Sequence, residues 1–412
     1  MVGPYLISSK CRTHEEHRLS ERLLVMTLAG VQFTHIMDFM VLMPLGPQLM
    51  RVMHISPREF GFLVAAYTLS ASVAAFTMAL FIDRFDRRHA LLFLYAGFVV
   101  STLLCGLAPG YDSLLAARAF AGAFGGVAGA AVYSIIGDAI PPERRGAATG
   151  AVMTAFSVSA IAGVPIGLFL ATLLTWRAPF LFLVLVSSLI LIGVWRLVPP
   201  VRAHLKHAVG PSRPWQQARA LFADPNHRRA LALPATLVFG GFCVIPFLSP
   251  YAVSNVGLTE GDLPYIYLFG GLATAFTSRW IGRLCDRYGK REVFAVVAGV
   301  SIIPLLVLTN LPPVPVWAML LTTTSFMIFI SGRFVPAMAL VTSSAQPRMR
   351  GSLLSFSAAL QHLSSGLASL CGGFLIGHAA TGALTHYWLV GLIAAGCTLL
   401  AIQIAWRIKP VS

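Results

Sequence analysis

The sequence predicts an all-α membrane protein with twelve transmembrane helices arranged as two six-helix, pseudo-symmetric bundles. Three observations support this: apolar runs of about 20 residues recur along the chain, Lys and Arg gather on one side of these runs, and the second half repeats spacings of the first. Hydrophobic residues make up 57% of the 412 residues and charged residues only 11%. Soluble domains carry about 25% charged residues, so lipid must surround most of the chain.

The hydropathy pattern divides the chain into spans of a length that can cross a bilayer. It predicts helices at 22–48, 60–82, 89–108, 113–139, 147–173, 177–198, 229–253, 264–284, 291–311, 315–341, 351–378 and 385–407. The polar, proline-rich segment 199–228 is expected to be a cytoplasmic loop between two bundles, 22–198 and 229–407. Segments 1–21 and 408–412 are expected to be cytoplasmic ends. The first apolar run continues directly into further spans, so we interpret it as a transmembrane helix and not as a cleaved signal.

The distribution of basic residues predicts the orientation of the chain. With these spans, 25 of the 30 Lys and Arg residues fall on one side, three on the other and two inside the membrane. Cytoplasmic loops are rich in Lys and Arg. Both termini are therefore predicted to be cytoplasmic, with the chain in the plasma membrane, as in a bacterial inner membrane.

Composition also argues against other classes of function. The net charge of +15 comes from short basic clusters between apolar runs, which does not indicate nucleic-acid binding. The six cysteines are scattered singly, so we expect neither a metal site nor a disulfide framework. The chain has no G-x-x-x-x-G-K-[ST] loop, which argues against an ATP-driven pump.

An internal repeat relates the two halves. Asp83 and Arg84 recur as Asp286 and Arg287 at an offset of 203 residues. The same offset relates Pro47 to Pro250, Ile55 to Leu258, Ser56 to Thr259 and Glu59 to Asp262. Parallel repeats of this kind place a substrate site between the halves, near the middle of the bilayer.

The loop after the eighth span carries the most specific motif, Gly282-Arg-Leu-Cys-Asp286-Arg287-Tyr-Gly289-Lys-Arg291. It resembles the signature loop of the major facilitator superfamily, G-x-x-x-D-R-x-G-R-R. The copy after the second span is degenerate, with Ala79 and Asp86 in place of the two glycines. The resemblance covers essentially the whole chain, and it implies the major facilitator fold and a transporter, not an enzyme.

These two loops are candidates for gating. A glycine allows helices to approach closely, and an aspartate at a helix end can meet a neighbouring helix N-terminus or an adjacent arginine. Making and breaking such contacts biases a protein toward one conformation. We expect this role for Asp83, Arg84, Arg87, Gly282, Asp286, Arg287, Gly289 and Arg291. The alternative is that the basic residues only fix the topology.

Ionisable residues inside spans are costly in lipid and therefore indicate function. Asp38 lies in the first span, with His35 three residues earlier on the same face. Arg118 lies in the fourth span and Arg333 in the tenth. In the superfamily, helices 1, 4, 7 and 10 line the central cavity, so the resemblance places these charges at the translocation site.

This arrangement suits proton coupling. A dry cavity favours the protonated form of a carboxyl group, and a nearby arginine favours the ionised form. Movement of Arg118 or Arg333 would then switch Asp38 between the two. Arg118 also matches the helix-4 arginine of proton-coupled family members. The alternative is a static ion pair that holds helices together.

Two further spans carry candidate residues. Gly163, Pro165 and Gly167 in the fifth span partly resemble the "antiporter" motif of drug–proton exchangers, G-x-x-x-G-P-x-x-G-G; an ordinary packing kink is the alternative. Gln361 and His362 in the eleventh span are candidates for the polar lining of the cavity. A neutral, packed histidine is the alternative for both His362 and His35.

The favoured interpretation is a secondary active exporter of a small molecule (drug-like, sugar or metabolite) in exchange for protons, by rocker-switch alternating access. The resemblance is strongest to the bacterial sugar-efflux and multidrug-efflux branch. The expected partners are the substrate, protons and the lipid bilayer, without nucleic acid; the proton motive force replaces a cofactor, and we expect a monomer. The alternatives are a proton-coupled uptake symporter or uniporter, a lipid or lysolipid flippase, and a receptor that does not transport.

Overall fold

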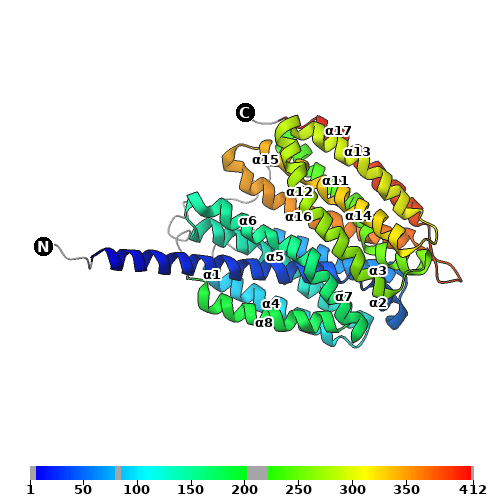
Figure 1. Ribbon diagram of the computed structural model, residues 1–412, viewed down its shortest axis with the longest axis horizontal. Coiled ribbons are helices and arrows are strands. Elements are labelled where there is room, and N and C mark those ends of the chain that lie inside the picture. The colour runs from blue at the N-terminus through cyan, green and yellow to red at the C-terminus, as the bar shows by residue number, and fades with distance from the viewer. Residues whose placement is uncertain (1–5, 79–84, 202–220, 410–412) are drawn as a thin grey trace.

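The computed structural model describes residues 6–78, 85–201 and 221–409, which are almost entirely helical (Figure 1). The N-terminal half contains α1 (Leu6–Val41), α2 (Gly46–Met53), α3 (Pro57–Met78), α4 (Arg87–Leu107), α5 (Tyr111–Ala139), α6 (Pro142–Val158), the π-helical turn η2 (Ser159–Gly163), α7 (Val164–Leu173) and α8 (Ala178–Leu197).

The C-terminal half follows the same order. It contains α11 (Pro225–Tyr251), the π-helical turn η3 (Ala252–Val256), the 3₁₀ turn η4 (Glu260–Asp262), α12 (Leu263–Tyr288), α13 (Lys290–Thr309), α14 (Val316–Gly332), α15 (Phe334–Ser343), α16 (Pro347–Leu375) and α17 (Tyr387–Trp406). A short antiparallel hairpin, β1 (Gly377–His378) with β2 (Leu384–Thr385), joins the last two helices.

Ten helical segments of the described chain are long and apolar enough to cross a membrane. The other two long helices, α12 and α16, contain 26 and 29 residues and pack beside them in the C-terminal half. Their lower hydropathy comes from charged residues near the end of α12 and from polar residues along α16. Together these elements account for the twelve predicted spans.

Several boundaries differ from the sequence prediction. α1 begins at Leu6, well before residue 22, because the polar segment ahead of the apolar run has no Gly or Pro and continues the helix. The predicted helix 22–48 breaks after Val41 and resumes as α2, since Pro44 and Pro47 interrupt the backbone hydrogen bonds. α11 begins at Pro225, inside the expected loop 199–228. Residues 202–220 of that loop lie outside the described residues.

Local structure confirms the repeat between the halves. The backbone N–H of Ser56 donates to the Glu59 carboxylate at 2.7 Å, which caps α3. The backbone N–H of Thr259 donates to the Asp262 carboxylate at 2.9 Å, 203 residues later. The same cap therefore opens the second span of each half.

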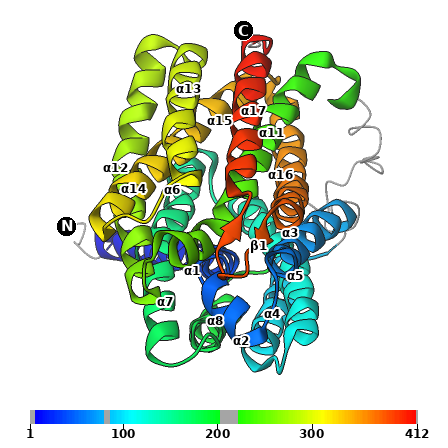
Figure 2. The ribbon, with the colours of Figure 1, turned by 90° about the vertical axis from the view of Figure 1, so that its right-hand side faces the viewer.

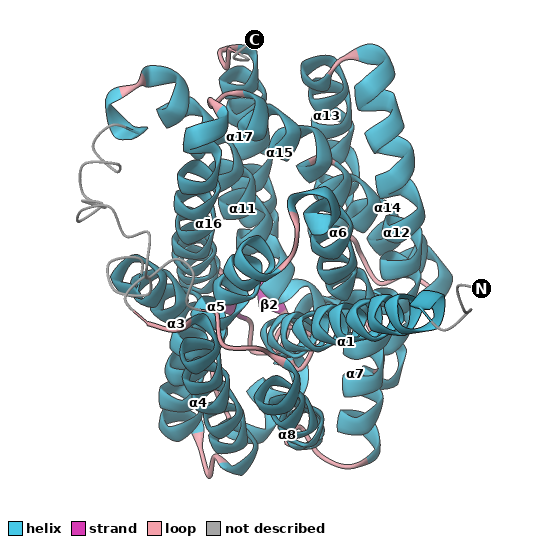
Figure 3. Cartoon of the chain, turned by 90° about the vertical axis from the view of Figure 1, so that its left-hand side faces the viewer, coloured by secondary structure: helices cyan, strands magenta, loops and turns pink. Residues whose placement is uncertain are grey.

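The two halves are closed against each other at the end that carries α2, which Figure 2 faces. There Arg51 of α2 forms an ion pair with Glu260 of η4. Along the contact between α3 and α16, a Cβ added to Gly61 would lie 2.8 Å from the carbonyl oxygen of Ser369. Such a distance requires glycine. The halves diverge toward the opposite end, where α1 begins and α17 ends (Figures 1 and 3). Only α3 and α16 stay together there within the described chain, with the Phe76 and Phe356 rings 6.0 Å apart.

We predict that Gly61→Ala destabilises the protein by about 1–3 kcal/mol, because the added methyl group forces apart two packed backbones. Gly282→Ala is the matched control, since a Cβ at Gly282 would meet nothing within 4 Å. Thermal unfolding of the purified proteins measures both effects. Equal melting temperatures for the two variants would contradict the packing of α3 against α16.

Candidate functional site

A buried ion pair joins α1 to α5. Arg118 Nη1 donates to Asp38 Oδ2 at 2.8 Å and to the Asp38 carbonyl oxygen at 3.3 Å. Both residues are 0% exposed. The structure therefore brings together two of the three buried charges that the sequence singled out.

The pair leaves part of its hydrogen-bonding capacity unused. Asp38 Oδ1 and Arg118 Nε have no hydrogen-bond partner in the described part of the chain. A buried carboxylate oxygen without a partner is costly, and a proton on that oxygen would remove the charge. Asp38 is thus placed to accept a proton while Oδ2 stays bound to Arg118.

Tyr67 of α3 supports the arginine from the other side. The Arg118 guanidinium lies 4.4 Å from the centre of the Tyr67 ring, a cation–π contact. The Tyr67 hydroxyl shares a hydrogen bond of 2.8 Å with His35 Nδ1, and the two rings stack at 6.3 Å. His35, Tyr67, Arg118 and Asp38 therefore form one connected, buried cluster, which we call the Asp38 cluster.

Glycines of α5 make room for this cluster. A Cβ at Gly125 would lie 2.8 Å from the Tyr67 hydroxyl oxygen and 3.1 Å from His35 Nδ1. A Cβ at Gly129 would lie 3.2 Å from His35 Nε2 and 3.4 Å from Gln32 Oε1. The small residues of this helix thus serve the site as well as helix packing.

Sequence reasoning did not single out two members of this region, Tyr67 and Gln32. Gln32 Oε1 is buried without a hydrogen-bond partner in the described chain, and like His35 Nε2 it would lie within 3.4 Å of a Cβ at Gly129. Gln32, His35 and Asp38 are spaced three residues apart, so they follow one face of α1. That spacing is the signal that would have identified Gln32; nothing in the sequence around Tyr67 distinguishes it from other buried aromatics.

Arg333 lies elsewhere, at the break between α14 and α15 in the other half. Its Nη1 donates to the Thr398 hydroxyl at 2.8 Å and to the Ser301 hydroxyl at 3.3 Å, and its Nη2 donates to the Leu237 carbonyl at 3.4 Å. It makes no ion pair with Asp38. The expectation that the three charges share one site therefore holds only for Asp38 and Arg118.

The two candidates on α16 follow each other in the chain. Gln361 Nε2 donates to the Ser357 hydroxyl within α16 at 3.1 Å. His362 is half-buried.

The fifth-span motif holds α7 against α1. A Cβ at Gly163 would lie 3.1 Å from the Met37 sulfur, and one at Gly167 would lie 2.8 Å from the Val41 side chain. Pro165 opens α7 directly after the π-helical turn η2. This packing fixes the stretch of α1 on both sides of Asp38, and π-helical turns often occur at functional sites.

The signature loops place their arginines at helix ends. Asp83 and Arg84 lie outside the described residues. Arg87 pairs with Asp138 at 3.1 Å, and Arg88 donates to the Trp195 carbonyl at the end of α8. Arg291, 203 residues after Arg88, donates in the same way to the Ile408 carbonyl after α17. Both arginines therefore cap the last helix of their half.

The rest of the second loop is open in this conformation. Asp286 and Arg287 are exposed, and the Arg287 guanidinium lies 5.2 Å from the Tyr288 ring. Gly289 has a φ of +97°, which requires glycine and ends α12. Gly282 faces open space, so the close approach expected from the sequence is not made here.

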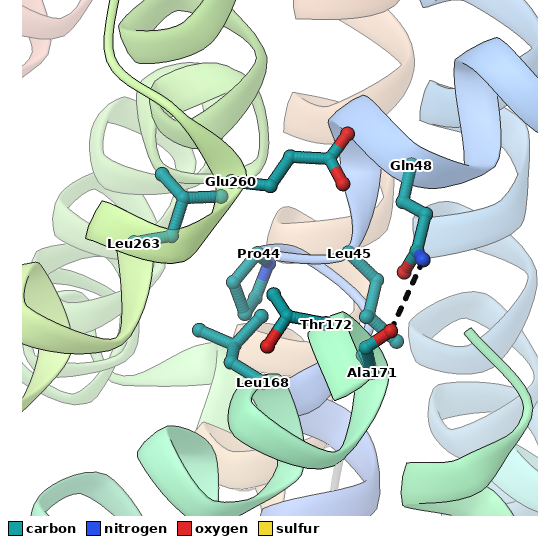
Figure 4. A pocket seen from close by; sticks show the side chains of 8 residues that line it. All are labelled: Pro44, Leu45, Gln48, Leu168, Ala171, Thr172, Glu260 and Leu263. Carbon is teal, nitrogen blue, oxygen red and sulfur yellow. Dashed lines mark hydrogen bonds between the residues drawn. The ribbon is translucent and has the colours of Figure 1, made fainter. Parts of the chain in front are cut away.

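A small pocket at the α2 end lies between the halves (Figure 4). Its wall includes Gln48, whose Nε2 donates to the Ala171 carbonyl at 3.2 Å, and Glu260. The pocket measures about 10 Å³, enough for about one water molecule. It is too small to hold a cargo molecule.

The fold and the buried site define a polytopic helical transporter. The sequence profile of the Major Facilitator Superfamily matches residues 28–278 and 231–412. The chain therefore belongs to the Major Facilitator Superfamily.

Individual relatives support this family assignment. The chain is 28% identical to the uncharacterized MFS-type transporter YceJ of Bacillus subtilis (strain 168), over 84% of this chain and 87% of that protein. It is 27% identical to a chloramphenicol resistance protein of Streptomyces lividans, over 83% of this chain and 86% of that protein. The crystal structure of a D-xylose-proton symporter has the same fold, with a TM-score of 0.73 at 17% identity over 94% of this chain and 97% of that one.

We predict that Arg118→Gln destabilises the protein by about 3–5 kcal/mol, because it leaves the buried Asp38 carboxylate unpaired. The double variant Asp38→Asn/Arg118→Gln should be more stable than Arg118→Gln alone, since it removes both charges. A double-mutant cycle of thermal unfolding measures this coupling. Additive effects of the two substitutions would contradict a direct ion pair.

Proposed function

We propose that this protein exports drug-like small molecules in exchange for protons by alternating access, with Asp38 as the proton carrier. The buried Asp38–Arg118 pair carries this proposal, because Asp38 Oδ1 has no partner in the described chain and is available for a proton. The relative from Streptomyces lividans is a chloramphenicol resistance protein, which favours a drug-like cargo and outward transport.

The geometry supports a switch in the strength of the pair. When Asp38 is ionised, Arg118 binds a carboxylate at 2.8 Å. When Asp38 is protonated, Arg118 keeps its hydrogen bond to the Asp38 carbonyl at 3.3 Å and its cation–π contact with Tyr67. The arginine therefore stays in place while its attraction to the Asp38 side chain weakens, which lowers the cost of moving α1 relative to α5.

The contacts between the halves support alternating access. The α2 end is closed by the pair of Arg51 with Glu260 and by the stacking of Phe39 on Phe242 at 5.6 Å. Near the fifth-span motif, a Cβ on Gly271 of α12 would lie 3.1 Å from the backbone of Ala160 in η2. Rocking about these tight contacts would open the α2 end and bring together the opposite ends, where Gly282 now faces open space.

The orientation follows from the basic residues. Most Lys and Arg residues of the described chain lie at the diverging end, and cytoplasmic ends of membrane proteins are the basic ones. The diverging end then faces the cytoplasm, as an exporter that binds its cargo inside the cell requires. Protons would reach Asp38 from the α2 side of the membrane and leave it toward the cytoplasm.

We predict that green fluorescent protein fused after Ser412 is fluorescent in bacterial cells, because the C-terminus is cytoplasmic. Alkaline phosphatase fused at the same place should be inactive, because it folds only outside the cytoplasm. The reverse pattern would overturn the orientation, and with it the direction of transport.

We predict that Asp38→Asn reduces proton-driven chloramphenicol transport to the level of protein-free liposomes, because asparagine cannot carry a proton. The assay uses purified protein in liposomes with an acidic interior, which drives accumulation by an antiporter. Exchange of labelled for unlabelled chloramphenicol moves no net proton and should persist.

Asp112→Asn is the control, because Asp112 is an exposed aspartate at the start of α5. It should retain both activities. Unchanged coupling in Asp38→Asn would refute the proposed carrier. Accumulation driven only by an acidic exterior would show an uptake symporter, and transport of lysolipid in place of chloramphenicol would show a flippase.

A further inference from the structure

A second arginine is buried in the C-terminal half without an ionic partner. Arg333 is 1% exposed and lies among α11, α13 and α17. Its three hydrogen bonds go to two hydroxyl groups and one carbonyl, all neutral acceptors. Within the described residues no carboxylate forms an ion pair with it.

This arrangement is unfavourable for a charge surrounded by lipid and apolar side chains. A buried guanidinium is normally paired with an anion, because its transfer from water costs several kcal/mol. Arg118 in the N-terminal half meets this requirement through Asp38. Arg333 contacts only neutral hydroxyl and carbonyl groups among the described residues, so its positive charge is not balanced by an anion.

The repeat places a glycine where the first half has its buried carboxylate. The offset of 203 residues that relates the two capping boxes also relates Asp38 of α1 to Gly241 of α11. A Cβ at Gly241 would lie 4.0 Å from Arg333 Nη2 and 3.6 Å from Ile245 Cδ1, both ordinary contacts. The C-terminal half thus has an arginine beside a glycine, with room for at least one carbon-sized group between them.

Arg333 also has unused donors, one of them on the nitrogen beside Gly241. A guanidinium has five N–H donors. The Nε of Arg333 has no partner in the described chain, and Nη2 donates only to Leu237, which leaves one Nη2 hydrogen unused. Nε and Nη2 form the edge of the guanidinium that binds a carboxylate side-on with two parallel hydrogen bonds. This edge, whose Nη2 lies beside Gly241, is therefore the one suited to an anion.

We propose that Arg333 and the glycine face of α11 at Gly241 form a binding site for a small anion, either a halide ion or the carboxylate group of a ligand. The anion binds the Nε–Nη2 edge and neutralises the buried guanidinium, as Asp38 neutralises Arg118 in the other half. The Ser301 and Thr398 hydroxyls hold the opposite edge and keep the guanidinium oriented. This proposal does not depend on proton coupling at Asp38.

The test is thermal unfolding of the purified full-length protein in lipid nanodiscs. Sodium methanesulfonate, which is neither a halide nor a carboxylate, is replaced stepwise by sodium chloride or sodium formate at constant ionic strength. For the wild type we expect a saturable rise in melting temperature of about 2 °C or more, as binding to the folded state requires. A response to chloride alone indicates a halide site, and a response to formate indicates a site for carboxylates.

Matched variants identify the site. Gly241→Asp should raise the melting temperature in methanesulfonate and abolish the response to anions, because its carboxylate takes the place of the ligand. Gly241→Asn has nearly the same size without the charge, and it should not raise the melting temperature in methanesulfonate. Arg333→Gln should also abolish the response.

The outcomes separate this proposal from a purely structural role. If Arg333 only ties α11, α13 and α17 together, neither anion shifts the melting temperature of the wild type, and the proposal is overturned. An anion response that persists in Gly241→Asp overturns it as well. Neither result bears on Asp38, whose coupling is measured by transport.

Discussion

The burial of the Asp38–Arg118 pair is the interaction on which the N-terminal half depends. Neither charge is stable alone in a lipid-surrounded interior, since each would cost several kcal/mol. The pair therefore requires α1 and α5 to lie close enough for a side-chain hydrogen bond, which measures 2.8 Å between Asp38 Oδ2 and Arg118 Nη1. The glycines of α5 and the packing of α7 on α1 provide that proximity. A shift of either helix would separate the two buried charges and leave each of them unpaired. Under our proposal, protonation of Asp38 removes this constraint and allows the helices to move.

The two halves share a backbone plan but differ in charge. The same capping interaction opens their second spans, and the same arginine, Arg88 or Arg291, caps their last helix. Inside the bundles the symmetry ends: the first half pairs its arginine with a carboxylate, while the second has Gly241 beside Arg333. Under our proposals, the first half exchanges protons and the second binds an anion. The two halves thus share a helical scaffold, and single side chains give each half its own proposed role.

Much of the fold could be predicted from the sequence. Apolar runs located the spans, and the 203-residue offset revealed the two halves. The candidate site was predicted in part: Asp38, Arg118 and His35 belong to one cluster, whereas Arg333 does not. Tyr67 and Gln32 were missed, because an aromatic or an amide in an apolar helix becomes informative only when its neighbour on another helix is known. Pro165 indicated a bend in the fifth span, beside η2, but the break at Arg333 was not predicted, since hydropathy carries no information about backbone hydrogen bonds.

The sequence by itself determined the class of protein, its division into two halves and the positions of the charges along each helix. Lipid imposes these features directly, because every span must be apolar and must satisfy its own backbone hydrogen bonds. Only the tertiary structure decided which charges meet. The partner of a buried group depends on the rotation and crossing of helices that are far apart in the chain, as Arg118 is 80 residues from Asp38. Packing thus paired one arginine with a carboxylate and left the other facing hydroxyl groups and a glycine.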